Sequence, residues 1–250
     1  MPDFHGRTFV VTGAASGIGR ATALHLVAAG ANVALVDLDP AGATAVAESS
    51  ADPSRTLVAA ADVARESDVI AAVDATEARF GTLHGTVTSA GIFDPADLTA
   101  IGDADLETFD RVISVNLRGT FLTLRAVLPR LEAGGAVVTI ASTAGLRGHG
   151  MGAAYTSSKG AVVALTRLAA VQYGPMGVRV NCVCPGATSG EGMGSTFLDP
   201  DFAGAMTRDV PLRRVGTAAE LGATIATLLS DETSYLSGQV IAVDGGATVR

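Results

Sequence analysis

Positive charge is scarce in this sequence of 250 residues. Lysine and arginine together number 17 against 25 aspartates and glutamates, which gives a formal net charge of -8 and a pI near 4.9. Such an acidic chain lacks the basic patch on which nucleic-acid binding and attraction to anionic lipid headgroups depend. We therefore expect no nucleic acid and no membrane among its partners.

Long apolar runs and cysteines are equally scarce. Polar residues or glycine interrupt every apolar stretch before it reaches the length of a membrane span, and residues 1–7 contain no apolar core of a signal peptide. The two cysteines, Cys182 and Cys184, alternate along an apolar strand, a spacing that rarely suits a disulfide. No histidine is close enough in sequence to complete a zinc site. These features predict buried reduced thiols, no metal and a cytoplasmic protein.

The abundant residues describe an alternating α/β chain, with 48% hydrophobic residues and 30 glycines. Short apolar runs predict strands at 7–12, 32–37, 56–60, 84–89, 135–141, 177–183 and 239–243. Helical periodicity predicts helices near 17–29, 40–50, 66–80, 103–132 (two helices), 152–173 and 217–230. Repeated strand–helix–strand units with wholly apolar strands predict a seven-stranded, mostly parallel sheet covered by helices on both faces. This is a doubly wound, Rossmann-type α/β fold, whose ligands bind at the carboxyl ends of the strands.

One segment departs from this alternation. Residues 187–211 begin rich in glycine and then carry apolar side chains before periodicity resumes. Long irregular segments in compact domains are often lids over binding sites. We expect a single domain spanning 1–250, with 187–211 as its substrate lid.

The only lysine, Lys159, follows Tyr155 by four residues within a predicted helix, and the other sixteen basic residues are arginines. Residues four apart share a helix face, so the phenol and the ammonium lie side by side. A nearby positive charge lowers the pKa of a tyrosine from about 10, which makes it a usable general acid or base. An ammonium differs from a guanidinium in shape and in its response to burial, so the position favours lysine specifically. The alternative is a surface lysine beside an unrelated tyrosine.

A glycine cluster follows the first predicted strand and opens a helix. Gly13, Gly17 and Gly19 lie in the run TGAASGIG. Glycines at this point permit a tight turn and bring backbone N–H groups close to a pyrophosphate at the helix N-terminus. The cluster predicts a dinucleotide-binding loop.

Asp37 ends the second predicted strand, 18 residues after Gly19, where an acid accepts hydrogen bonds from a ribose diol. Its carboxylate repels a 2′-phosphate, and neither Ala15 nor Leu38 supplies a cation to receive one. NAD is therefore predicted in preference to NADP. The alternative is an aspartate that only stabilises the turn before Pro40.

In chain order, these motifs together with Asp62-Val63, Asn116 and Ser142 resemble the short-chain dehydrogenase/reductase family in its compact branch. Asn181-x-x-x-Pro185-Gly186 and Val243-Asp244-Gly245-Gly246 are similar to that family as well, so the resemblance covers the whole chain. It implies a nicotinamide dinucleotide cofactor, a homotetramer or homodimer, and interconversion of alcohols and carbonyls.

The resemblance also implies roles for individual residues. Tyr155 moves the proton, Lys159 lowers the pKa of Tyr155 and binds the nicotinamide ribose, Ser142 holds the substrate oxygen, and Asn116 supports a water chain to Lys159. The implied cofactor contacts are Gly13, Ser16, Gly17, Ile18, Gly19, Asp37, Leu38, Asp62, Val63, Ser89, Ala90, Gly91, Tyr155, Lys159, Pro185, Gly186 and Thr188.

Two positions depart from the family pattern. Thr88-Ser89-Ala90-Gly91 stands where the family commonly has Asn-Asn-Ala-Gly, and Ser89 donates hydrogen bonds over a shorter reach. Gly190 stands where a threonine usually holds the carboxamide. Either Thr188 takes over that contact or the loop is reorganised.

The substrate is less well specified by the sequence. Phe93, His149, Met193 and Phe197 are candidate substrate contacts, and Met151, Phe202 and Met206 extend an apolar wall. His149 is equally well explained as a loop histidine, and the wall as core or lid packing. A small, neutral, fairly apolar substrate fits this set, although Arg147, Arg208, Arg213 and Arg214 keep an anionic one open.

The sequence thus predicts an NAD(H)-dependent oxidoreductase that interconverts a secondary alcohol and a ketone, with Tyr155 as general acid/base. An isomerase or dehydratase on the same fold is one alternative, which the glycine spacing disfavours. A non-catalytic dinucleotide-binding regulator is another, which the intact Ser142, Tyr155 and Lys159 disfavour.

Overall fold

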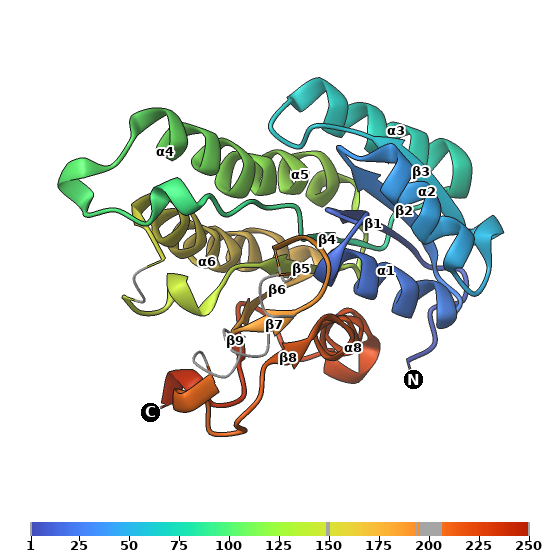
Figure 1. The fold of residues 1–250 in the computed structure, drawn as a ribbon. Coiled ribbons are helices and arrows are strands. Elements are labelled where there is room, and N and C mark those ends of the chain that lie inside the picture. The colour runs from blue at the N-terminus through green and yellow to red at the C-terminus, as the bar shows by residue number, and fades with distance from the viewer. Residues whose placement is uncertain (1, 149–150, 194, 196–206, 250) are drawn as a thin grey trace.

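The structure, a computed structural model, describes residues 2–148, 151–193, 195 and 207–249 (Figure 1). Two of the predicted substrate contacts, His149 and Phe197, lie outside the described residues. The same is true of Phe202 and Met206. Those four predictions therefore stay predictions.

A parallel sheet forms the centre of the molecule, with the strand order β3-β2-β1-β4-β5-β6-β9. The strands are β1 (Thr8–Thr12), β2 (Asn32–Asp37), β3 (Thr56–Ala60), β4 (Gly85–Thr88), β5 (Ala136–Ile140), β6 (Arg179–Pro185) and β9 (Val240–Val243). The order reverses between β1 and β4, where the chain crosses from one half of the sheet to the other. The predicted seven-stranded α/β fold is confirmed, and its crossover point is where such sheets bind ligands.

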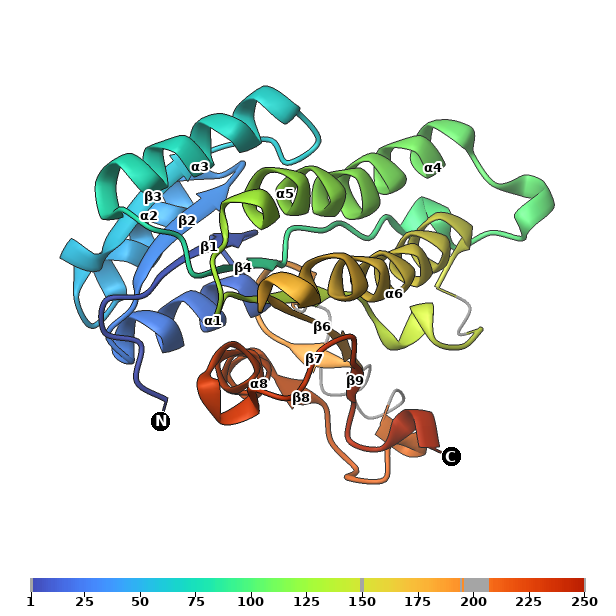
Figure 2. The ribbon, with the colours of Figure 1, turned by 180° about the vertical axis from the view of Figure 1, so that it is seen from behind.

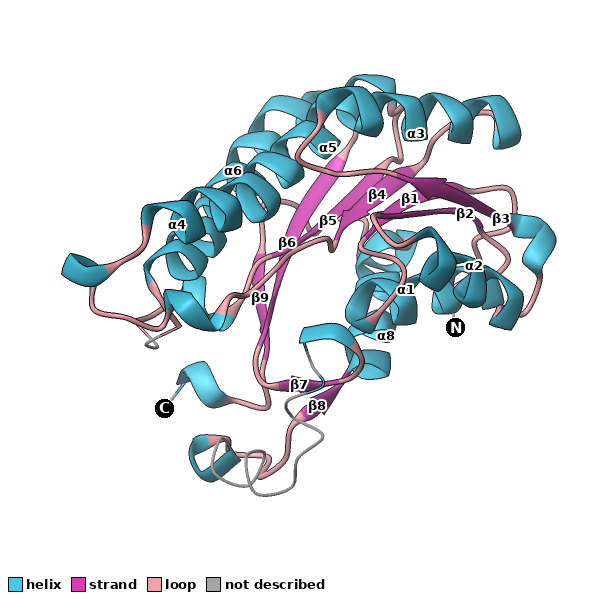
Figure 3. Cartoon of the chain, turned by 45° about the horizontal axis from the view of Figure 1, so that its top comes forward, coloured by secondary structure: helices cyan, strands magenta, loops and turns pink. Residues whose placement is uncertain are grey.

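Helices cover both faces of this sheet, as Figures 1 and 3 show. They are α1 (Gly17–Ala28), α2 (Pro40–Ser49), α3 (Glu66–Phe80), α4 (Leu106–Ile113), α5 (Gly119–Val127), α6 (Ala153–Tyr173) and α8 (Ala218–Leu229). The first face carries α3, α4, α5 and α6, and the second carries α1, α2 and α8 (Figure 2). In the described part of the chain, no helix combines the length and the apolar character needed to cross a bilayer.

The core consists of two main apolar clusters, one on each face. Val11 of β1 packs in the cluster that contains Leu26 of α1 and Ile225 of α8. Its neighbour Val10 packs on the opposite face in the cluster that contains Leu124 of α5. Successive strand side chains point to opposite faces, so a sheet covered on both sides requires apolar residues throughout. Each fully buried aliphatic side chain contributes about 1.5–3 kcal/mol of transfer free energy, which holds the strand ends in fixed relative positions.

The segment predicted to hold two helices contains α4 and α5, and a π-helical turn joins them. The residues Ser114–Arg118 form a π-helical turn between α4 and α5, and the backbone stays helical at both junctions. A π-turn inserts one extra residue into an α-helix and rotates the side chains beyond it, and such turns occur frequently at functional sites. Asn116 lies in this turn and is buried. The two helices predicted within 103–132 are therefore confirmed as α4 and α5, and the π-turn that joins them was not predicted.

The two cysteines lie on β6, with both side chains in a small cluster under α6. Both thiols are buried and free, and their Sγ atoms are 3.9 Å apart. The prediction of buried thiols is confirmed. Across the residues that the structure describes, no group of three or more His, Cys, Asp or Glu side chains is placed to hold a metal ion.

Candidate active site

Three of the predicted catalytic side chains meet where β5 ends against α6. Tyr155 and Lys159 share one face of α6, both buried, and the Lys159 Nζ lies 5.7 Å from the centre of the Tyr155 ring. Ser142 follows β5, and its side chain lies near enough to the Tyr155 hydroxyl to affect the protonation of the phenol. Lys159 donates to the Ile140 carbonyl at the end of the same strand, over 3.0 Å. The i,i+4 geometry expected from the sequence is present, and it is inside the protein, not on its surface.

Burial dominates the protonation of both groups. It raises the pKa of Tyr155 above its usual value, and the nearby Ser142 side chain only partly opposes this. Burial also lowers the pKa of Lys159 to about 8, because the charged ammonium is removed from water. The sequence predicted a lowered pKa for Tyr155, and this prediction is wrong for the protein without cofactor, where the pKa is raised. The lysine, with only 3% of its surface exposed, is an ammonium placed at a considerable desolvation cost.

Asn116 reaches the same place from the π-turn. Its Oδ1 accepts from the Ile92 N–H over 2.7 Å, and its Nδ2 donates to the Ile92 carbonyl over 2.9 Å and to Ser158 Oγ over 3.2 Å. A Cβ built on Gly91 would lie 3.2 Å from Asn116 Oδ1 and 3.3 Å from Lys159 Nζ. Asn116 and Lys159 therefore approach a common point beside Gly91. The water chain assigned to Asn116 stays a prediction.

The glycine loop follows the carboxyl end of β1, which is separated from β5 by the single strand β4. Gly13 has φ +68°, and a Cβ there would lie 2.7 Å from the backbone of Ala90. A side chain on Gly19 would overlap the Gly13 carbonyl. Both positions require glycine because the loop runs close to the segment after β4 and to the first turn of α1.

The N-terminus of α1 has no side-chain cap and favours an anion. Ser16 is its N-cap residue and makes no side-chain capping hydrogen bond, and the first turn carries no acidic residue. The first N–H groups of a helix and its dipole attract negative charge. Together with the glycine loop, this end of α1 fits the pyrophosphate of a dinucleotide.

Asp37 braces the glycine loop. Its Oδ2 accepts from the Ala15 N–H over 2.8 Å, and its Oδ1 accepts from the Asp39 N–H over 3.0 Å. The turn-stabilising role that the sequence left open is therefore present, beside a second role in holding the loop. Leu38 next to it is 75% exposed. Contact of Asp37 with a ribose diol stays a prediction.

The remaining predicted cofactor contacts lie along the same edge of the sheet. The Asp62 carboxylate accepts from the Ala64 N–H over 2.9 Å, and Val63 is buried against Gly119. Ala90 donates its N–H to Thr12 Oγ1 over 3.2 Å. The carboxyl ends of β1 to β6 thus bring the predicted catalytic and cofactor residues to one edge, as the fold requires.

The first part of the predicted lid lies over the glycine loop. A Cβ on Gly17 would lie 3.2 Å from the Glu191 carbonyl, and one on Gly192 would lie 2.8 Å from Ser16 Oγ. Glu191 also forms an ion pair with Arg20 of α1 over 2.8 Å. Neither member of this pair was singled out from the sequence, because nothing local relates positions 171 residues apart.

Of the predicted substrate contacts that are described, one touches the tyrosine. Phe93 stacks edge-on against the Tyr155 ring, with 5.5 Å between ring centres, and Met151 packs in the same cluster. Met193 is 49% exposed and lies in the segment over the glycine loop. Sequence reasoning also missed Asp97, a buried carboxylate that binds the backbone of Tyr155.

Known proteins are similar to almost the whole chain. The family model described as enoyl-(acyl carrier protein) reductase matches residues 13–248. Levodione reductase of Leifsonia aquatica is 40% identical, with 97% of this chain and 94% of that protein covered. 2-(S)-Hydroxypropyl-CoM dehydrogenase 3 of Xanthobacter autotrophicus is 39% identical, with 95% of each covered. The crystal structure of a short-chain dehydrogenase/reductase, described as glucose/ribitol dehydrogenase, from Brucella melitensis matches with TM-score 0.91 and 35% identity over 98% of both chains.

The chain belongs to the short-chain dehydrogenase/reductase family. Membership makes it an oxidoreductase, since the named relatives are dehydrogenases and reductases that act on alcohol or carbonyl groups. It also implies a nicotinamide dinucleotide cofactor. The glycine loop and the uncapped end of α1 fit that group.

Two positions depart from the short-chain dehydrogenase/reductase pattern, and both lie beside the glycine loop. The first is Ser89, whose carbonyl carbon would be 3.0 Å from a Cβ on Gly13, and the second is Gly190. Thr188 donates its hydroxyl to the Gly186 carbonyl over 3.0 Å, and Gly186 itself donates to Val243 over 3.1 Å. A Cβ on Gly190 would be 3.4 Å from the Ala218 Cβ of α8 and 3.8 Å from the Gly17 Cα. Position 190 therefore lies between α8 and the glycine loop, and the contact of Thr188 with the carboxamide stays a prediction.

Proposed function

We propose that this protein is an NAD(H)-dependent oxidoreductase that interconverts a secondary alcohol and a ketone, with Tyr155 as general acid/base. The observation that carries the proposal is the pair of buried side chains Tyr155 and Lys159 beside the half-buried Ser142, at the same sheet edge as a glycine loop suited to a pyrophosphate. A dinucleotide-binding regulator needs no proton donor at this edge. The substrate is proposed to be small, neutral and fairly apolar, since Phe93 lies against the tyrosine ring.

Each polar residue then has a chemical task. The Ser142 and Tyr155 hydroxyls hold the substrate oxygen, and Tyr155 gives a proton to it in ketone reduction or takes one in alcohol oxidation. Lys159 stabilises the phenolate that forms, because its ammonium is buried close to the ring. The nicotinamide, when bound, supplies or accepts the hydride. Phe93 keeps water from the phenol by covering its ring.

The organisation of the chain is part of the same proposal. Residues 1–250 act as one domain, the segment 187–211 covers the bound substrate, and the chain assembles as a homotetramer or homodimer. The packing of Glu191 and Gly192 over the glycine loop supports the covering role.

A panel of secondary alcohols and ketones tests the proposed activity. With NAD⁺ and an alcohol of the panel, absorbance at 340 nm should rise, and with NADH and the matching ketone it should fall. An isomerase would convert a panel compound without net change at 340 nm. Tight NADH binding with no conversion across the panel would favour a regulator.

The Asp37 carboxylate should set the cofactor preference, because it repels a 2′-phosphate at the end of β2. We expect kcat/KM to be higher with NADH than with NADPH. In Asp37→Asn the charge is lost while an oxygen acceptor for the Ala15 N–H is kept, so the ratio of NADPH to NADH efficiency should rise by about tenfold or more, since ~1.4 kcal/mol of repulsion corresponds to tenfold. Initial rates with both cofactors measure this ratio. Higher efficiency with NADPH in the unaltered protein would contradict the assignment.

A further inference from the structure

A buried carboxylate holds the first turn of the helix that carries Tyr155. Asp97 is 4% exposed, and its two oxygens accept from consecutive backbone N–H groups of α6, from Ala154 over 3.0 Å and from Tyr155 over 2.8 Å. The N-cap residue of α6, Gly152, has no side chain with which to satisfy these donors. Asp97 therefore supplies from 57 or 58 residues away the cap that a local side chain usually provides.

Gly152 is matched to this carboxylate. It has φ +85°, which disfavours other residues, and a Cβ at this position would overlap both the carboxylate and the backbone carbonyl of Asp97. Any side chain at position 152 would push Asp97 away from α6. The cap of α6 therefore requires both a glycine at position 152 and an acid at position 97.

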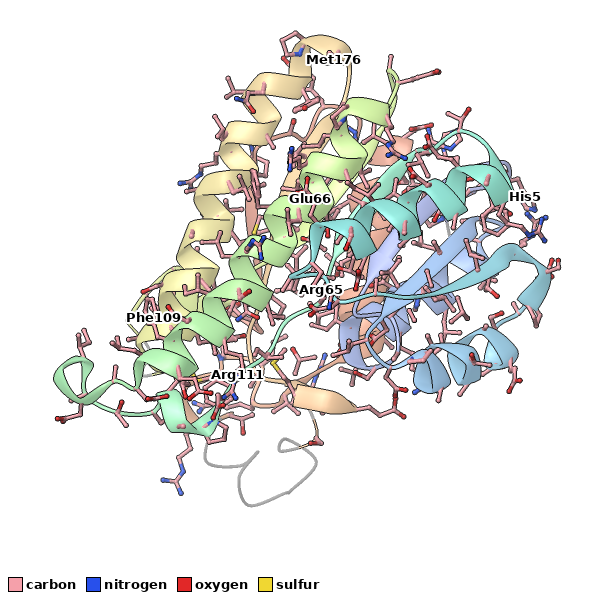
Figure 4. The ribbon with its side chains drawn as sticks, turned by 90° about the horizontal axis from the view of Figure 1, so that it is seen from above. His5, Arg65, Glu66, Phe109, Arg111 and Met176 are labelled. Atoms are coloured by element: carbon pink, nitrogen blue, oxygen red, sulfur yellow. The ribbon has the colours of Figure 1, made fainter. Side chains whose placement is uncertain are left out.

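The segment 92–97 that carries Asp97 touches the site at two further points. The backbone N–H and carbonyl of Ile92 both bind the side chain of Asn116, and the ring of Phe93 covers that of Tyr155. On its other side the segment is fixed to α4 by an ion pair between Asp94 and Arg111. Figure 4 shows Arg111 and Phe109 on α4, and Phe109 packs in the cluster around Tyr155. The segment therefore connects the π-turn that contains Asn116 to the first turn of α6, which contains Tyr155.

We propose that Asp97 is a positioning residue for catalysis, which fixes the Tyr155 hydroxyl against Ser142 by binding the backbone of the first turn of α6. This inference rests on the proposed function of Tyr155. Asp97 contacts neither the phenol nor the cofactor loop through any hydrogen bond of the described residues, so its effect passes through the backbone of α6. Catalysis is sensitive to such displacement, because a shift of about 1 Å in a reacting group can cost ~10²-fold in rate.

Asp97→Ala should lower kcat by about 10–100-fold, while the KM for the alcohol and the Kd for NADH change by less than about threefold, within ~0.7 kcal/mol. Asp97→Asn keeps one acceptor oxygen and should restore part of the lost kcat. Gly152→Ala should reproduce the kcat loss of Asp97→Ala from the other side of the contact. The double variant should then lose little more than either single one, because both remove the same contact.

Asp105→Ala is the matched control. Asp105 caps α4 by accepting from the Thr108 N–H over 2.8 Å, so this variant loses an aspartate cap that is exposed and has no side-chain hydrogen bond to α6 among the described residues. Its kcat should stay within about twofold of the unaltered protein. Equal kcat losses in Asp97→Ala and Asp105→Ala, at a temperature where circular dichroism shows both folded, would overturn the proposal. So would an unchanged kcat in Asp97→Ala.

Hydrogen exchange separates this inference from the proposed function. The Ala154 and Tyr155 amides should exchange faster in Asp97→Ala, while those of α8 should not change. If the unaltered protein turned over none of the panel substrates, the proposed function would fail. Faster exchange of these amides in Asp97→Ala would in that case still show that Asp97 anchors α6. If turnover were present and these amides exchanged at the original rate, the positioning role alone would be refuted.

Discussion

Tyr155→Phe should lower kcat by about 10³-fold and leave the affinity for NADH unchanged. General acid/base catalysis by a positioned side chain contributes roughly 10²–10⁴-fold, and the substitution removes only the oxygen that moves the proton. The ring is buried against Phe93, so phenylalanine fills the same space and the packing of α6 is kept. Stopped-flow absorbance at 340 nm gives the rate, and NADH fluorescence gives the affinity.

Tyr235→Phe is the control for that experiment. Tyr235 is fully exposed, and the same atom is removed without contact with the site. It should turn over at the original rate. Substantial activity in Tyr155→Phe would assign the proton transfer to another group and remove the centre of the proposed mechanism.

Lys159→Met should abolish most of the activity and also change how stability depends on pH. Burial lowers the pKa of Lys159 from 10.5 to about 8, so the unfolded chain holds more protons than the folded one between these values. The free energy of unfolding of the unaltered protein therefore gains from this group as the pH rises from 8 to 10.5. Below pH 8 the buried charge costs about 3 kcal/mol in full, since one pKa unit corresponds to ~1.4 kcal/mol.

Methionine has a similar volume and no charge, so its contribution does not vary with pH. We expect the stability of Lys159→Met relative to the unaltered protein to fall by about 2 kcal/mol between pH 7 and pH 10. The loss of the hydrogen bond to the Ile140 carbonyl lowers the stability of the variant by a similar amount at both pH values. Urea unfolding at the two pH values measures the difference. A constant difference would show that the lysine is not charged at a cost inside the protein.

Lys159→Arg separates charge from shape at the same position. The guanidinium stays charged throughout this pH range and is larger and planar, so it cannot occupy a site with 3% exposure beside Gly91. We expect at least a tenfold loss of kcat together with lower stability. Activity close to that of the unaltered protein would refute the requirement for an ammonium.

Much of this architecture follows from local patterns in the sequence. Apolar runs located the strands of the sheet, with β2 and β3 predicted at their observed bounds. The four-residue spacing of Tyr155 and Lys159 sufficed to place them on one face, because helical geometry fixes that relation. Ser142 was found because it follows a strand whose carboxyl end must lie at the site.

Features that depend on tertiary contacts were not accessible in the same way. In the sequence, Asp97 is not distinguished from the other aspartates near it, and only the folded chain brings it to α6. The π-turn at Asn116 has no periodicity of its own, so the two helices were predicted without the turn that joins them. The raised pKa of Tyr155 depends on how deeply its ring is buried, which spacing along a helix does not specify. Each of these is set by contacts between distant segments.

The transfer of deuterium from a secondary alcohol to the cofactor is the most direct test of the account. The alcohol should carry deuterium on its carbinol carbon, and NAD⁺ should be the only acceptor in the reaction. The account predicts that mass spectrometry finds one deuterium in each NADH formed, with one ketone produced per NADH. Conversion of the alcohol with no label in the cofactor, or NADH binding with no transfer from any alcohol of the panel, would contradict it.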